Sequence, residues 1–262
     1  SVKIPFFHYF ICFFMNIQFD GPIKFIHLGD AGPNLLTLKR QQELIKELDY
    51  TTCKAIVFLG NNKIFSAGLN LIDLANASED EVSEIFQTFM HLLISIRNFP
   101  GPVFSIVSGH AIAGGCLLAL ACDHRYGVFG FHRMGLNEMA LSLDLPKSIF
   151  SILSTTINPN YLFEIASQCN LYLPGQAFKR GLINEYIKNP FIGKKKATEL
   201  ALMKAKKLAN FYIDAGEPFC RLKKTFTDNS NFDHNVLVKN WFSSKTQDKI
   251  KAALRVLKKE KK

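Results

Sequence analysis

Short apolar runs alternate with longer amphipathic stretches along the first half of the chain. Residues 15–19 and 23–28 flank the turn-forming residues 20–22 (Asp-Gly-Pro), which predicts a strand, a turn and a second strand. Residues 54–60 and 103–107 are continuous apolar runs, which are typical of strands buried on both faces. This part of the chain is therefore expected to form a largely buried sheet.

Helical spacing of apolar residues fills the intervals between these runs. The spacing predicts helices over residues 35–48 and 78–97, a loop over residues 61–77, and a short buried helix over residues 113–121. Strands that alternate with helices favour right-handed crossovers and a parallel sheet, and so an α/β fold. The second half of the chain is mostly helical in pattern, with one short strand expected near residues 184–187.

Charge is distributed unevenly along the 262 residues. The formal net charge is +10, but residues 194–262 alone carry 18 Lys and Arg against 7 Asp and Glu. The preceding residues are close to neutral, so an evenly basic coat for nucleic acid is excluded and no nucleic-acid partner is expected. The pattern predicts three parts: an extra segment over residues 1–14, a core over residues 15–193, and a basic helical region over residues 194–262.

The amino-terminal segment and the cysteines bear on membrane insertion, metal binding and cellular compartment. Residues 4–19 are rich in Phe but interrupted by Pro5 and His8, and no stretch is long enough to predict a transmembrane span. A remnant of a targeting sequence and an extra strand both fit residues 1–14. The six cysteines form no Cys-x-x-Cys pair, so no metal site is expected, and reduced thiols favour the cytosol or an organelle matrix.

Two glycine-bearing segments follow the two buried strands. They are residues 65–71 (Phe-Ser-Ala-Gly-Leu-Asn-Leu) and residues 109–116 (Gly-His-Ala-Ile-Ala-Gly-Gly-Cys). Small residues at such a point let backbone N–H groups approach a ligand, and two N–H groups converging on one oxygen form an oxyanion hole. Neither segment is a dinucleotide or ATP motif. Each, taken alone, is also compatible with a simple tight turn.

A third segment, residues 134–141, places a single carboxylate, Glu138, among apolar residues. Burial would raise the pKa of this carboxyl group and make it a proton carrier near neutral pH. A structural glutamate held in a salt bridge is the alternative interpretation of the same pattern.

The three segments, in this order and spacing, resemble the enoyl-CoA hydratase/isomerase (crotonase) superfamily. Residues 55–71 are similar to its first oxyanion-hole motif and residues 102–123 to its second, and the resemblance extends from Met15 to the carboxyl terminus. It implies a crotonase-like ββα superhelix as the α/β core, with a carboxyl-terminal helical region that forms trimers. Residues 113–120 and 135–138 are most similar to the mitochondrial Δ3,Δ2-enoyl-CoA isomerase branch.

Position 117 bears on the choice between hydration and isomerisation. Hydratases of the superfamily carry a glutamate where this chain has Leu117. Hydration needs two carboxylates to position and activate water, whereas an isomerase needs one base that removes a proton and returns it elsewhere. Leu117 therefore favours an isomerase.

The resemblance also implies roles for individual residues. The backbone N–H groups of Leu69 and Gly114 would bind the thioester oxygen of a 3-enoyl-CoA, and Glu138 would move a proton from C2 to C4. The residues implied in substrate binding are Ser66, Ala67, Gly68, Leu69, Asn70, Gly114 and Asn137. No metal or redox cofactor is expected, because the thioester itself acidifies C2 and CoA is part of the substrate.

Three departures from the branch, two of which could lower activity, stand beside a composition rich in Phe, Lys and Asn that suggests a drifted sequence and keeps a second class of function open. The branch has Asp at the position of Asn70 and Gly at that of Ser142, and the loop between Asp123 and Glu138 is about one residue shorter here. A crotonase-like structural subunit of a larger mitochondrial assembly, with weak or no activity, is the alternative. A thioesterase or dehalogenase is a third option, although no His or Asp nucleophile stands at a matching position.

Partners and location follow from the same resemblance. It implies an acyl-CoA thioester substrate, a homotrimer or hexamer built through the carboxyl-terminal helices, and a mitochondrial matrix location. Some Lys residues of the basic region 194–262 are predicted to border the nucleotide end of CoA, from the same or a neighbouring subunit.

Overall fold

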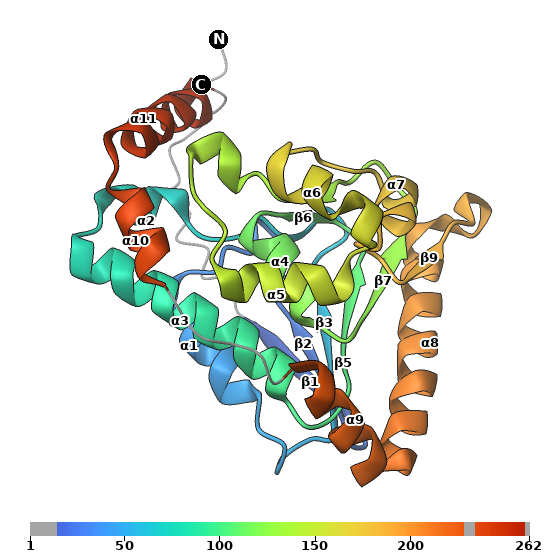
Figure 1. The fold of residues 1–262 in the computed structure, drawn as a ribbon. Coiled ribbons are helices and arrows are strands. Elements are labelled where there is room, and N and C mark those ends of the chain that lie inside the picture. Colours follow the sequence, from blue (N-terminus) through green and yellow to red (C-terminus); the bar gives the residue numbers. More distant parts are fainter. Residues whose placement is uncertain (1–14, 228–233, 260–262) are drawn as a thin grey trace, which may run out of the picture.

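The computed structural model describes residues 15–227 and 234–259, and its centre is a twisted six-stranded sheet (Figure 1). In spatial order its strands are β1 (Asn16–Asp20), β2 (Ile23–His27), β3 (Ala55–Leu59), β5 (Val103–Val107), β7 (His124–Val128) and β9 (Glu185–Ile187). Strands β1 and β2 form an antiparallel hairpin, and every other neighbouring pair is parallel. The predicted strand–turn–strand and the two predicted buried strands are confirmed.

A second, three-stranded parallel sheet stands beside the first. It contains β4 (Ile64–Ser66), β6 (His110–Ile112) and β8 (Met134–Gly135), in that order. Each of its strands follows a strand of the large sheet along the chain and precedes a helix. This repeated strand–strand–helix unit is the predicted ββα superhelix.

Helices surround the two sheets. In chain order they are α1 (Leu38–Glu47), α2 (Leu71–Asn76), α3 (Glu79–Asn98), α4 (Gly114–Ala121), α5 (Lys147–Thr156), α6 (Pro159–Ser167), α7 (Pro174–Lys179), α8 (Gly193–Ala215), α9 (Glu217–Thr227), α10 (Asn235–Trp241) and α11 (Ser244–Lys259). Short 3₁₀ helices η1 (Glu138–Leu141) and η2 (Pro190–Ile192) complete the set. No helix in the described ranges is long and apolar enough to cross a bilayer.

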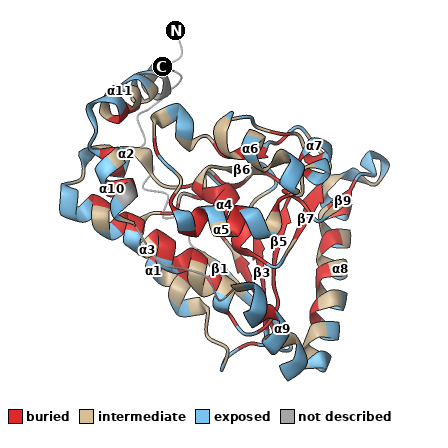
Figure 2. Cartoon of the chain, viewed as in Figure 1, coloured by how far each residue is buried: buried red, intermediate tan, exposed pale blue. Residues whose placement is uncertain are grey.

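The core lies on both faces of the large sheet, whose central strands β3 and β5 are wholly buried (Figure 2). Helix α8 covers one face through four alanines at four-residue spacing, which are fully buried: Ala197, Ala201, Ala205 and Ala209. Small side chains at this spacing let a long helix lie close to the sheet. Helices α1, α3 and α4 fill the space on the other face.

The long helix α3 begins where the sequence predicts. Ser78 accepts a hydrogen bond from the N–H of Glu81, and the Glu81 carboxylate accepts one from the N–H of Ser78. This capping box satisfies two N–H groups that a helix end leaves without partners. Its buried face includes Phe86 and Phe89, which point toward the centre of the molecule.

The last two helices pack against the core of the same chain. Trp241 of α10 is 1% exposed and meets Phe86 of α3 edge to face, with ring centroids 5.9 Å apart. The Thr246 hydroxyl donates to the backbone oxygen of Ser142 (3.3 Å), and the N–H of Asp144 donates to the side-chain oxygen of Asn240 (2.7 Å). Helix α10 therefore lies against the first half of α3 and helix α11 over η1, on the left side of Figure 1.

Two expected loops contain regular structure. The loop predicted over residues 61–77 contains β4 and α2, and the one between Asp123 and Glu138 contains β7 and β8. The sequence of β7 does not show the continuous apolar run of a buried strand, because it contains Arg125. This side chain is nevertheless buried, and its guanidinium donates to the backbone oxygen of Cys122 (2.7 Å). Strands of two or three residues are too short to show any periodicity.

The cysteines in the described ranges are free thiols. Cys53, Cys116 and Cys122 are buried, and Cys169 and Cys220 are half-buried. Cys12 and the predicted extra segment 1–14 lie outside the described residues.

Candidate active site

The two glycine-bearing segments meet at the start of α4. A side chain on Gly68 would place its Cβ 2.9 Å from the backbone nitrogen of Gly114, and one on Gly114 would place its Cβ 3.4 Å from the nitrogen of Leu69. Gly68 also has φ +84°, which side chains rarely allow. The approach at 2.9 Å requires glycine at position 68, whereas 3.4 Å at position 114 is an ordinary contact distance, and the two values together make the N–H groups of Leu69 and Gly114 neighbours.

A set of hydrogen bonds fixes the first segment in place. The Ser66 hydroxyl donates to the backbone oxygen of Asn34 (2.8 Å) and accepts from the N–H of Gly68 (3.1 Å). The N–H of Ala67 donates to the oxygen of Pro33, and that of Leu36 to the oxygen of Gly68. The segment is thus held on both sides before any ligand binds.

The N–H groups of Leu69 and Gly114 donate to no protein acceptor in the described part of the chain. Gly114 opens α4, where helix geometry leaves the first N–H groups without partners and adds positive potential. Two such neighbouring donors can bind one oxygen atom that develops negative charge.

Glu138 begins η1, in the loop that follows β8. Its carboxylate accepts a hydrogen bond from the N–H of Asn137 (2.9 Å). Desolvation by the surrounding protein raises the pKa of Glu138 to about 7, although the N–H groups of Glu138 and Asn137 act in the opposite direction. The residue as a whole keeps intermediate exposure, although its carboxyl group is desolvated.

No ion pair to Glu138 exists among the described residues, which argues against the alternative of a structural salt bridge. The Cys116 thiol connects the carboxylate to α4. Burial raises the pKa of Cys116, and the charge of Glu138 raises it further. The predicted base and the start of α4 are therefore electrostatic neighbours.

The remaining predicted residues have local structural roles. Asn137 contributes its backbone N–H, and its side chain caps nothing in η1. Asn70 caps α2, because its side-chain oxygen accepts from the N–H of Ile72 (3.2 Å). Ser142 ends η1 with φ +60°, and its N–H is directed at the oxygens of Glu138 and Met139. A non-glycine residue in the left-handed region therefore ends the turn that begins at Glu138.

Leu117 lies one turn into α4 and is 2% exposed, within the apolar core. A carboxylate at this position would stand on the same short helix as Gly114. The chain instead places an alkyl group there, so Glu138 has no acidic partner from this position.

Phe89 is a residue that the sequence does not single out. Its ring lies 3.1 Å from the position of a Cβ on Gly114, so it forms part of the wall beside the two N–H groups. Apolar helix positions all look alike in sequence, and only the packing of α3 on α4 distinguishes this one.

Two cavities of the described structure are lined in part by cationic residues. One of about 450 Å³ and another of about 310 Å³ flank α9, and both are lined in part by Arg97 and Lys223. None of the residues predicted for the active site lines either one. Among residues 15–227 and 234–259, no group of three or more His, Cys, Asp or Glu could hold a metal ion.

Comparison with known proteins decides the family. A model described as enoyl-CoA hydratase/isomerase matches residues 21–229, most of the chain. The chain belongs to the enoyl-CoA hydratase/isomerase family. The resemblance inferred from the glycine segments and Glu138 is confirmed at this level.

Sequence relatives include proteins named for a hydratase domain and proteins named as isomerases. Enoyl-CoA hydratase domain-containing protein 3, mitochondrial, from Homo sapiens is 34% identical over 40% of this chain and 37% of its own length. Enoyl-CoA delta isomerase 1, mitochondrial, from Mus musculus is 29% identical over 47% of this chain and 43% of its own length. The matched region thus spans about two fifths of the length of these curated relatives.

Solved structures confirm the fold. Human mitochondrial delta3-delta2-enoyl-CoA isomerase superposes with a TM-score of 0.75 at 20% identity, covering 95% of this chain and 99% of that one. Enoyl-CoA hydratase from Bacillus halodurans superposes with a TM-score of 0.76 at 18% identity, covering 91% and 99%. Because an isomerase and a hydratase fit equally well, the fold does not choose the reaction.

Proposed function

We propose that this chain is a Δ3,Δ2-enoyl-CoA isomerase, which moves the double bond of a 3-enoyl-CoA into conjugation with the thioester. The observation that carries the proposal is Glu138, a single carboxyl group with its pKa raised to about 7, in the region where the N–H groups of Leu69 and Gly114 are neighbours. One base and one oxyanion site are the groups that a proton shift next to a thioester requires.

The proposed reaction has two proton transfers. The Glu138 carboxylate removes a proton from C2, and the negative charge spreads to the thioester oxygen, which accepts hydrogen bonds from Leu69 and Gly114. The protonated Glu138 then delivers the proton to C4, and the double bond between C3 and C4 becomes one between C2 and C3. The proposal includes no resident cofactor, because the thioester supplies the acidity of C2.

Leu117 supports isomerisation over hydration. Adding water across the conjugated double bond would call for a second carboxylate, and position 117 presents a buried alkyl side chain. Hydration remains the second candidate because relatives named for a hydratase domain are among the sequence matches.

The test is conversion of a 3-enoyl-CoA to the 2-trans product, followed by absorbance of the conjugated thioester. We expect turnover by the unmodified chain and loss of about a thousandfold or more in the Glu138→Gln variant, because the base is removed. Asp144→Asn is the matched control, since Asp144 is an exposed acid six residues further along and should leave the rate unchanged.

Two other outcomes would redirect the assignment. Hydration of a 2-enoyl-CoA as fast as isomerisation would contradict the argument from Leu117. Absence of turnover together with absence of CoA-ester binding would favour the structural subunit of a mitochondrial assembly, with Asn70 and Ser142 as the departures behind it.

The biological setting is part of the same proposal. We place the reaction in fatty-acid β-oxidation in the mitochondrial matrix, supported by relatives whose names carry the word mitochondrial. A homotrimer or hexamer is the proposed assembly, and sedimentation of the purified chain would test it.

A further inference from the structure

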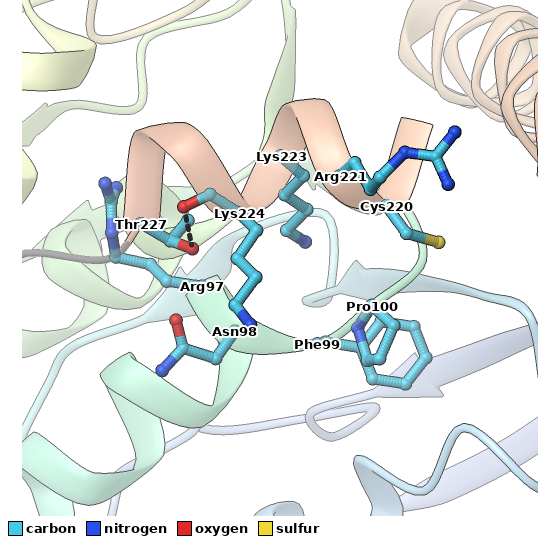
Figure 3. Close-up of a pocket in the computed structure, with 9 residues that line it drawn as sticks. All are labelled: Arg97, Asn98, Phe99, Pro100, Cys220, Arg221, Lys223, Lys224 and Thr227. Carbon is cyan, nitrogen blue, oxygen red and sulfur yellow. Dashed lines mark hydrogen bonds between the residues drawn. The ribbon is translucent and has the colours of Figure 1, made fainter. Parts of the chain in front are cut away.

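A cleft of about 450 Å³ lies between α9 and the turn that joins α3 to β5 (Figure 3). The side chains that line it carry mostly positive charge. Its lining residues are Arg97, Asn98, Phe99, Pro100, Cys220, Arg221, Lys223, Lys224 and Thr227. Four of these are cationic and none is acidic, so the cleft has a net positive lining.

Two of the four cations are already paired: Arg221 with Glu217 of the same helix (2.8 Å) and Lys223 with Asp123. Lys223 is 7% exposed, its ammonium lies 2.7 Å from the Asp123 carboxylate, and it also donates to the backbone oxygen of Gly101 (2.9 Å). These bonds attach α9 to the core. Lys223 is therefore structural and contributes little free charge.

Arg97 and Lys224 form no salt bridge with a carboxylate of the described residues. Arg97 donates to two neutral acceptors, the Thr155 hydroxyl (3.1 Å) and the backbone oxygen of Phe226 (3.0 Å), and makes no salt bridge with a described carboxylate. Burial lowers the pKa of Arg97, although the negative charge of Asp123 acts in the opposite direction.

The Lys224 side chain extends from α9 across the cleft toward Asn98, as Figure 3 shows. Its ammonium group forms no hydrogen bond or ion pair with the described residues. The end of α3 carries a partial negative charge that a cation in its last turn, Arg97, would offset. Lys224 adds a second positive charge near this helix end, beyond the one that Arg97 supplies.

The donor set suits a phosphate group. A guanidinium offers a planar fork, an ammonium offers a compact charge, and an amide adds a neutral donor, which together match the oxygens of a phosphate dianion. The volume exceeds that of a phosphate alone, and the exposed ring of Pro100, beside the almost fully buried Phe99, supplies an apolar wall on the same side. An organic group attached to the phosphate would fit against this wall.

We propose that the cleft beneath α9 is a binding site for a phosphate monoester with a small ring-bearing group, held by Arg97, Asn98 and Lys224. It is separate from the candidate active site and does not rest on the proposed isomerase function. The ligand is defined by its chemistry: a dianionic phosphate with one compact apolar substituent.

The test is calorimetric titration of the full chain with phenyl phosphate at constant ionic strength. We expect binding by the unmodified chain and about tenfold weaker binding by Lys224→Gln, since a charge-assisted hydrogen bond is lost. Lys224 makes no contact that folding needs, so this variant should unfold at the same temperature.

Lys195→Gln on α8 is the matched control, because Lys195 is equally exposed but remote from the cleft lining. It should bind phenyl phosphate as the unmodified chain does. Equal affinity in Lys224→Gln, an equal loss in Lys195→Gln, or no binding by the unmodified chain at about 10 mM ligand would overturn the proposal. Phenol serves as the uncharged comparison and should not bind.

Discussion

The ammonium of Lys223 lies 2.7 Å from the carboxylate of Asp123, and this pair joins α9 to the residue that precedes β7. Asp123 also accepts a hydrogen bond from the N–H of Val103 (2.7 Å). Lys223 is the one buried residue of α9, while Leu222 and Phe226 of the same helix are 59% and 62% exposed. The helix is therefore attached through a charge, and its apolar side faces outward.

Removing one member of this pair should cost far more than an exposed charge would. Lys223→Met leaves the partly exposed Asp123 carboxylate without its cation, and we expect the free energy of unfolding to fall by about 1–3 kcal/mol. Urea denaturation measures it. The double variant Lys223→Met with Asp123→Asn should recover part of the loss, and full additivity of the two changes would contradict a direct interaction.

Glu138 should make stability depend on pH. Its pKa is raised in the folded protein, so the folded state holds the proton more tightly than the unfolded chain does. Stability from this group is complete below its unfolded pKa and declines as pH rises to about 7. At pH 8, Glu138→Gln should therefore have a higher free energy of unfolding than the unmodified chain, by on the order of 2 kcal/mol after allowance for solvent screening. Thermal denaturation should show this as a higher unfolding temperature at pH 8 and no difference in favour of the variant at pH 4.

The same ionisation should govern the rate. If Glu138 is the base, kcat/KM for a 3-enoyl-CoA should rise with pH and level off above about 7, because only the carboxylate can accept the C2 proton. A pH–rate profile is the measurement. A flat profile between pH 5 and 8 would argue against Glu138 as the group that titrates.

Gly68 and Gly193 form a natural pair for separating backbone strain from close approach. Both have positive φ, +84° and +76°, but a Cβ on Gly68 meets the Gly114 nitrogen at 2.9 Å and one on Gly193 meets nothing within 4 Å. Each change to Ala should cost about 1 kcal/mol of stability from the backbone conformation. Only Gly68→Ala should also abolish isomerisation, because it pushes the Leu69 and Gly114 N–H groups apart; equal activity in the two variants would contradict the proposed oxyanion site.

Ser142 offers a stabilising change. It holds φ +60° without being glycine, so Ser142→Gly should raise the free energy of unfolding by about 0.5–1 kcal/mol. Thermal denaturation provides the measurement. Ser154→Gly, inside α5, is the control and should lower stability by a similar amount, because glycine weakens a helix interior.

The strongly patterned parts of the fold could be predicted from the sequence. Apolar runs identify β3 and β5 because both faces of those strands are buried, and helical spacing with a capping box identifies α3. The small sheet could not be predicted in this way. Its strands have two or three residues, and their pairing depends on contacts between distant segments.

The candidate site divides along the same line. The glycine segments and Glu138 carry recognisable chemistry, so their importance could be predicted, although their roles stay predictions. The contribution of the Asn137 backbone and the position of Phe89 against Gly114 depend on packing. The cleft beneath α9 was invisible for a similar reason, because Arg97 and Lys224 come from helices far apart in the chain.

The three-stranded sheet also controls how independently the active groups can change. Leu69, Gly114 and Glu138 each follow a different strand of it, β4, β6 and β8, by two or three residues. An insertion in a connecting segment outside these strands leaves all three positions intact, whereas a one-residue slip of a single strand moves one group and spares the other two. Each of the three groups can therefore be lost or replaced without the other two. The pairing of β4, β6 and β8 still sets the distances between the positions that remain.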